Sequence, residues 1–128
     1  MRKPHKKLDL WKLSMDHAVQ VYKVTERFPQ EERYGITGQI RRAGISIPSN
    51  IAEGAARQTR KEFVNYLHMA QGSLSEMDTL LELAKRLEFL PLEDWNTLDN
   101  DMERMDKMLS GLTRHQKRLQ VTPGRTRP

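Results

Sequence analysis

Apolar residues recur every three or four positions in four stretches of the chain, which is the period of an α-helix. In the clearest stretch, from residue 34 to residue 54, isoleucines recur at spacings of four, seven and four: Ile36, Ile40, Ile47 and Ile51. Ala43 and Gly44 fill the missing step of this face. The phase of the face continues across Pro48, so the sequence predicts one helix with a bend near that proline, and not two helices joined by a turn.

The apolar pattern and its interruptions predict four helices, at about residues 9–27, 30–57, 59–89 and 92–119. Short connections make successive helices antiparallel. The predicted fold is therefore all-α: an up-down-up-down antiparallel four-helix bundle spanning residues 9–119 of a single domain, residues 1–128. Residues 121–128 carry two prolines, a glycine and two arginines, and are predicted to form a flexible basic tail.

Local signals predict the helix starts and the faces turned to the core. Asp9 is the predicted N-cap of the first helix, and Thr59 and Glu62 form a capping box before the third. The predicted core face of the first helix is Trp11, Met15, Ala18, Val19 and Tyr22. That of the third is Phe63, Leu67, Ala70, Leu74, Met77, Leu81, Ala84 and Leu87, and that of the fourth is Trp95, Leu98, Met102, Met105, Leu109, Leu112 and Leu119.

The net charge of +5 is modest, but its distribution is uneven. The bundle gathers residues 1–12, 52–62 and 112–128 at one end, here called the basic pole, where thirteen Lys and Arg face three Asp and Glu. Such segregation favours a polyanionic partner, RNA or DNA. The alternative is that these charges keep helix ends soluble and compensate helix C-termini. The candidate nucleic-acid contacts are Lys6, Lys7, Arg57, Arg60, Lys61, Arg114, Lys117 and Arg118. Few aromatic residues accompany them, which predicts binding mainly to phosphates.

The sequence contains none of the motifs that carry common enzymatic chemistry. It has no cysteine, no Glu-x-x-His pair, no phosphate-binding glycine loop and no nucleophile elbow. We therefore expect no enzyme, no catalytic, cofactor-binding or metal-binding residue, and no small-molecule substrate. The scattered histidines are expected on the surface or hydrogen-bonded at the edge of the core. No apolar run is long enough for a membrane span, and the lack of cysteine suits a cytoplasmic protein.

The polar residues around the proline favour a structural role. Pro48 lacks an N–H and its ring crowds the carbonyl of Gly44, which needs another donor. The neighbouring polar side chains are suitable donors, and small residues on the third helix allow close packing. This predicted structural motif comprises Gly44, Ser46, Pro48, Ser49, Asn50, Glu53 and Gly54. A subunit contact or a ligand site is the alternative. Arg41 and Arg42, remote from the basic pole, are predicted subunit contacts.

These same residues carry a family resemblance. The run Ser-Ile-Pro-Ser-Asn-Ile-Ala-Glu-Gly at 46–54, Gln-Ile-Arg-Arg-Ala at 39–43 and Ala-x-Gly-Ser-x-x-Glu at 70–76 resemble the 23S rRNA intervening-sequence protein family. Phe-Pro-x-x-Glu at 28–32 adds to the likeness, which covers residues 8–115. Gly44 is a minor departure from the family pattern, in which alanine or another small residue is expected at this position.

The resemblance implies a small bacterial cytosolic four-helix bundle that assembles into a homopentameric ring. The family is distantly similar to accessory proteins of diversity-generating retroelements, basic pentamers thought to bind nucleic acid. It offers no catalytic residue to carry over, and its biochemical role is largely unassigned. The first hypothesis is a non-enzymatic, oligomeric, nucleic-acid-binding accessory protein. The alternative is a self-assembling scaffold or protein-interaction module with no nucleic-acid role.

Overall fold

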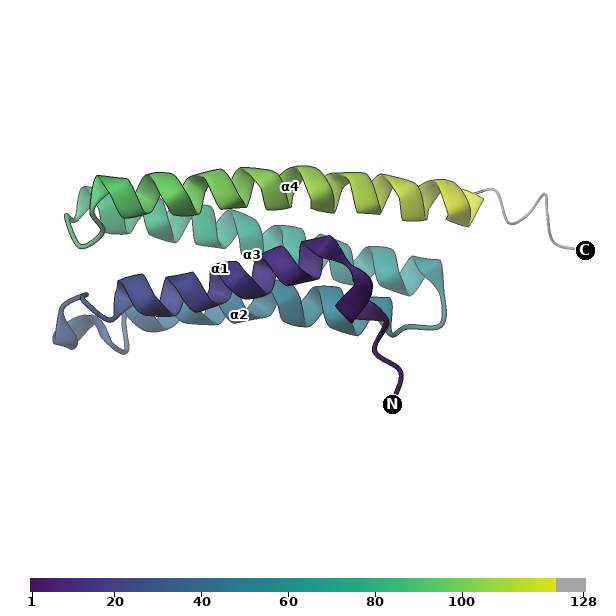
Figure 1. The fold of residues 1–128 in the computed structure, drawn as a ribbon, viewed down its shortest axis with the longest axis horizontal. Helices are drawn as coiled ribbons and strands as arrows, with labels where there is room; N and C mark the ends of the chain where they lie inside the picture. The colour runs from purple at the N-terminus through teal and green to yellow at the C-terminus, as the bar shows by residue number, and fades with distance from the viewer. Residues whose placement is uncertain (122–128) are drawn as a thin grey trace, which may run out of the picture.

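The computed structural model describes residues 1–121 as a bundle of four long helices. In Figure 1 the helices lie side by side and their connections fall at alternating ends, as in an up-down-up-down bundle. Each helix packs against the next, and α1 also packs against α4. The predicted all-α bundle is therefore confirmed. The helices are α1 (Asp9–Thr25), α2 (Ile36–Ala55), α3 (Arg60–Arg86) and α4 (Leu92–Val121), with short 3-10 helices η1 (Pro4–Lys7) and η2 (Gln30–Glu32).

Several predicted boundaries differ from the observed ones. The first helix starts at Asp9, and its N-cap is Leu8, so Asp9 is not the cap. The third helix ends at Arg86, since Glu88 has a positive φ of 65° that no α-helix continues through. The fourth helix includes Val121. The rest of the predicted tail lies outside the described residues.

The connection between α1 and α2 is longer than the sequence indicated. The second helix begins at Ile36 and not near residue 30, because residues 30–32 form the separate turn η2. Consecutive i→i+3 hydrogen bonds tighten this turn, including Glu32 N to Pro29 O at 2.9 Å and Gly35 N to Glu32 O at 3.0 Å. Such 3-10 geometry is typical of connectors. It allows Phe28, just before the turn, to be buried in the core.

The isoleucine face of α2 is the centre of the core, as predicted. Ile40, Ile47 and Ile51 are fully buried, and Ile36 and Ala43 are buried beside them. The helix continues through Pro48 to Ala55. Of the polar residues around the proline, Ser46 and Asn50 form hydrogen bonds within the fold, but Asn50 Nδ2 donates to the carbonyl of Ser46 at 2.9 Å and not to that of Gly44. Ser49 is exposed. The bend itself stays a prediction.

Small residues bring α2 and α3 together. Ser46 Oγ and Ser73 Oγ form a hydrogen bond of 2.8 Å between the two helices. Further along, a Cβ atom added at Gly54 would lie 2.7 Å from Tyr66 Cβ and 2.9 Å from Phe63 Cδ1. This separation is shorter than carbon atoms tolerate, so only glycine fits at position 54 without movement of α3.

The predicted core face of α1 is wrong for Met15, Val19 and Tyr22, whereas Trp11 is partly buried and packs against the core. Met15, Val19 and Tyr22 are 40%, 52% and 42% exposed, whereas the neighbouring face of the helix is buried. The buried residues are Leu10, Ser14, His17, Val21, Val24 and Thr25. The helix carries apolar residues on both faces, and the smaller ones fit the close approach to α2, where Val21 Cγ1 lies 3.7 Å from the Cβ position of Gly44.

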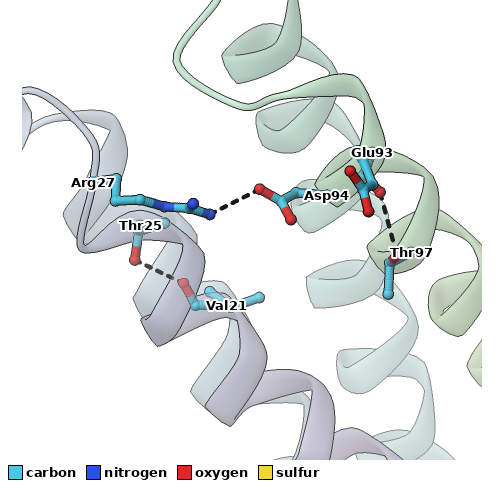
Figure 2. A network of polar contacts seen from close by, with 6 residues as sticks. All are labelled: Val21, Thr25, Arg27, Glu93, Asp94 and Thr97. Atoms are coloured by element: carbon cyan, nitrogen blue, oxygen red, sulfur yellow. Dashed lines mark hydrogen bonds and ion pairs between the residues drawn. The ribbon is translucent and has the colours of Figure 1, made fainter.

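The end of the bundle opposite the basic pole has charges that pair with each other. Arg27 Nη2 lies 2.8 Å from Asp94 Oδ2, which joins the end of α1 to the start of α4 (Figure 2). Lys85 Nζ lies 3.7 Å from the centroid of the Trp95 ring. Exposed pairs of this kind contribute about 0–1 kcal/mol each. They link the chain just after α1, and the end of α3, to the first turn of α4.

Candidate functional site

The fold brings the segments of the basic pole to the same end of the bundle. The N-terminal turn η1, the α2–α3 connection and the end of α4 all lie there (Figure 1). They carry the predicted nucleic-acid contacts, which are Lys6 and Lys7 from η1, Arg57, Arg60 and Lys61 from the connection and the first turn of α3, and Arg114, Lys117 and Arg118 from α4. The structure thus gathers residues from three distant parts of the sequence.

Arg57 is less available to a ligand than its neighbours. Its Nη2 lies 2.6 Å from Glu53 Oε1 and donates to Tyr66 Oη at 2.9 Å, and its guanidinium lies 4.9 Å from the centroid of the Tyr66 ring. These contacts hold the end of α2 against α3. Lys61 makes no ion pair with any described residue, and Arg60 reaches only Gln116 Oε1, at 3.5 Å. Arg60 and Lys61 are therefore the stronger candidates for binding an anion.

A cavity of about 570 Å³ opens at the basic pole, between the α2–α3 connection, the first turn of α3 and the end of α4. Arg60 and Lys61 line it together with the ring of Phe63 and three glutamines, Gln58, Gln116 and Gln120. Sequence reasoning placed the cations but missed the glutamines. The sequence indicates only that these glutamines lie near helix ends. It does not show that they share a cavity, because the lining residues come from separate segments.

A second hollow, of about 590 Å³, runs between α1 and α2 and is almost entirely apolar. This α1/α2 groove is lined by Trp11, Met15, Ala18, Val19 and Tyr22 from α1 and by Ile45, Pro48 and Ala52 from α2. His5 packs edge-on against Trp11 at its border, with ring centroids 4.9 Å apart. Met15, Val19 and Tyr22, predicted as core, are thus part of the surface. Larger exposed apolar patches mark interaction or ligand-binding sites, which makes this groove a candidate for one.

Arg41 acts within the chain. Its Nε donates to Thr25 Oγ1 at 2.9 Å and its Nη2 to the carbonyl of Tyr22 at 3.2 Å, and the guanidinium lies 4.5 Å from the centroid of the Tyr22 ring. It thereby satisfies a carbonyl in the last turn of α1. Arg42 is exposed on α2. The predicted subunit contacts of both arginines stay predictions.

His17 is the histidine that departs most from expectation. It is 1% exposed, and neither Nδ1 nor Nε2 has a hydrogen-bond partner among the described residues. Burial lowers the pKa of His17 to about 4, because the charged imidazolium is disfavoured away from water. The expectation of a surface or hydrogen-bonded histidine is therefore wrong at this position. Within residues 1–121, no group of three potential metal ligands includes it or any other histidine.

Negative charge collects on the α3–α4 side of the bundle. A shallow hollow there is lined by four carboxylates: Asp78, Asp99, Glu103 and Asp106. Burial raises the pKa of Asp99, and Glu103 and Asp78 add to the effect. None of the four forms an ion pair with another described residue, and Asp106 accepts a hydrogen bond from Gln71 at 2.7 Å. A polyanion would be repelled from this side and drawn to the basic pole.

A protein family and a solved structure are similar to this chain. Residues 6–111 match the family described as 23S rRNA-intervening sequence protein. A crystal structure of a protein of unknown function from the S23 ribosomal protein family of Bacteroides thetaiotaomicron is similar, with a TM-score of 0.76 and 28% sequence identity. The alignment covers 82% of this chain and 95% of that one. Among curated proteins, none matches the sequence. No helix of residues 1–121 combines the length and apolar character needed to cross a membrane.

Proposed function

The chain belongs to the 23S rRNA-intervening sequence protein family, and from this premise we propose that it is a non-enzymatic accessory protein of the bacterial cytoplasm that binds nucleic acid through its basic pole. The observation that carries the proposal is the gathering of cations from three chain segments at one end of the bundle, where Arg60 and Lys61 line a cavity. Contacts would be mainly to phosphates, which such clusters of Lys and Arg bind electrostatically.

The distribution of unpaired charge supports a defined binding surface. Arg60 and Lys61 are exposed at the pole, whereas Arg27 and Arg86 at the opposite end pair with carboxylates. The carboxylates of the α3–α4 side would repel a polyanion from that side of the bundle. A polyanion would therefore meet this molecule in a preferred orientation, with one end of the bundle facing it.

We also propose that the protein acts as a homo-oligomeric ring, a pentamer by analogy with its family. A ring of more than two copies needs two different surfaces on each copy. The α1/α2 groove supplies one. A set of exposed apolar side chains on α3, Met69, Leu83 and Leu87, supplies a second. Repeating the basic pole around a ring would add weak phosphate contacts by avidity.

The first prediction concerns salt dependence. The logarithm of the binding constant for RNA or DNA is expected to fall linearly with the logarithm of salt concentration. Replacing Arg60 and Lys61 together by alanine should reduce the slope by about 2, because each cation that no longer meets a phosphate lowers it by about 1. Fluorescence anisotropy of a labelled oligonucleotide, titrated at several salt concentrations, measures both slopes.

Arg104 and Lys107 provide the matched control for this prediction, since both are exposed on the middle of α4. Their double alanine variant removes the same charge and should leave the slope unchanged. Arg57→Ala should chiefly lower stability, because Arg57 already pairs with Glu53. The proposal would be contradicted if the unmodified protein bound neither RNA nor DNA at about 50 mM salt.

The second prediction concerns assembly. Aspartate at both Val19 and Ile45 would put charge into the α1/α2 groove, and is expected to convert the oligomer into monomers without unfolding them, because both side chains are about half exposed. Size-exclusion chromatography with light scattering gives the mass, and circular dichroism checks the fold.

Leu92→Asp is the control for assembly. Leu92 is an exposed apolar residue at the start of α4, outside the groove and the apolar set on α3. This variant should remain oligomeric. A monomeric wild-type protein, or an oligomer unaffected by charge in the groove, would rule out the proposed interface.

The α1/α2 groove favours one further candidate function, a self-assembling scaffold that binds another protein and not nucleic acid. This hypothesis shares the assembly prediction but not the salt dependence. An oligomer that shows no affinity for RNA or DNA would support it over the first proposal.

A further inference from the structure

Building on the proposed function, we propose that the cavity at the basic pole binds one unpaired nucleotide of a single strand, contacting its phosphate and its base together. Phosphate binding alone requires only cations. The cavity adds groups that phosphate does not need, an aromatic ring and three primary amides. Its volume of about 570 Å³ is in the usual range for small-molecule sites, roughly 300–1,000 Å³.

Gln116 is the amide best placed to contact a base. It is 9% exposed although it lies among charged residues near the end of a helix. Its Oε1 accepts a long hydrogen bond from Arg60, at 3.5 Å. The amide nitrogen of a glutamine carries two N–H donors, which this bond does not use. The edge of a base would accept from these donors, as happens when proteins read unpaired nucleotides.

Phe63 provides an apolar face beside the cations. It is half-buried in the first turn of α3, where one edge of its ring packs at Gly54 and the side chain also lines the cavity. Aromatic side chains in basic clefts commonly stack on the bases of single strands. Arg60 and Lys61, at the start of the same helix, would hold the adjoining phosphate.

A duplex cannot use the cavity in this way, because its bases are already stacked and paired. Duplex and single strand should therefore share the phosphate contacts and differ in those made by Gln116 and Phe63. This difference separates the inference from the proposed function itself, which needs only the cations.

The experiment uses the full-length protein and two labelled probes, an oligouridylate of about 15 nucleotides and an RNA duplex of the same length. Gln116→Met keeps the side-chain length and removes the amide, and Phe63→Leu keeps an apolar contact with Gly54 and removes the ring. Each is expected to weaken binding of the single strand about tenfold and to leave duplex binding within about twofold. Gln71→Met, on the acidic α3–α4 side, is the matched control and should change neither.

Thermal melts confirm that each variant is folded, and the two variants test the cavity independently. The inference would be overturned if a variant bound the single strand and the duplex equally more weakly than the wild type. It would also be overturned if neither variant bound the single strand more weakly while the Arg60 and Lys61 double variant bound both probes more weakly. Either result would leave a phosphate-binding surface. If the unmodified protein bound neither probe, the proposed function would fail as well.

Discussion

The protein is expected to lose about 3 kcal/mol of its free energy of unfolding as pH falls from about 6.5 to about 4, through His17 alone. The folded-state pKa of His17 is about 4, below the unfolded value of 6.5. Between these values the unfolded chain binds a proton at His17 that the folded chain excludes, so acid favours unfolding. Above about 6.5 this contribution is constant. Urea denaturation at a series of pH values measures the loss.

His17→Leu should abolish this part of the pH dependence, because leucine does not titrate. At pH 8 the variant is expected to be at least as stable as the wild type, since it removes two buried nitrogens that lack hydrogen bonds to the described residues. His68→Leu is the control, because it makes the same substitution at an exposed position of α3, and it should not remove the loss of stability seen for the wild type. Indistinguishable profiles for wild type and His17→Leu would show that the imidazole is charged or solvated in the folded state.

Gly54→Ala is expected to destabilise the protein by about 3 kcal/mol, at the upper end for overpacking. The added Cβ would lie 2.7 Å from Tyr66 Cβ and 3.3 Å from the carbonyl oxygen of Phe63. Neither atom is at the end of a flexible side chain, so α3 itself has to move. Thermal or urea denaturation measures the effect, which should appear as a lower midpoint.

Gly72→Ala is the matched control for Gly54. Gly72 lies on the exposed face of α3, and within residues 1–121 no atom beyond the local helix backbone lies within 4 Å of its Cβ position. The same substitution there should stabilise the helix by about 0.5–1 kcal/mol, because alanine is the better helix former. Equal effects at the two glycines would contradict the close approach of α2 and α3 at Gly54.

How far the sequence predicts the fold is best seen by comparing α2 with α1. In α2 four isoleucines recur on one face, and apart from Ile45 the other faces are polar or small, so the isoleucine spacing identifies the core. In α1 both faces carry apolar residues, and periodicity alone cannot say which of them packs inside. Size favours the larger side chains for the core, but the narrow space beside Gly44 accepts the smaller Val21.

The candidate site was predictable to a similar extent. Antiparallel topology is enough to place Arg60 and Arg114 at the same end of the molecule, because it depends only on helix order. The pairing of Arg57 with Glu53 and the burial of Gln116 depend on side-chain positions that helix order does not determine. The cavity between these segments could not be predicted for the same reason.

Arg41 would influence the proposed assembly from within its own subunit, because it supports the α1/α2 groove without lining it. Its guanidinium stacks on Tyr22 and binds the carbonyl of the same residue, and Tyr22 forms part of the wall of the α1/α2 groove. The position of Tyr22 in the groove wall thus depends partly on Arg41, a side chain of α2 that does not line the groove. A substitution at Arg41 would leave Tyr22 less well ordered. It would therefore weaken the proposed assembly by changing the shape of the groove, without removing a contact between subunits.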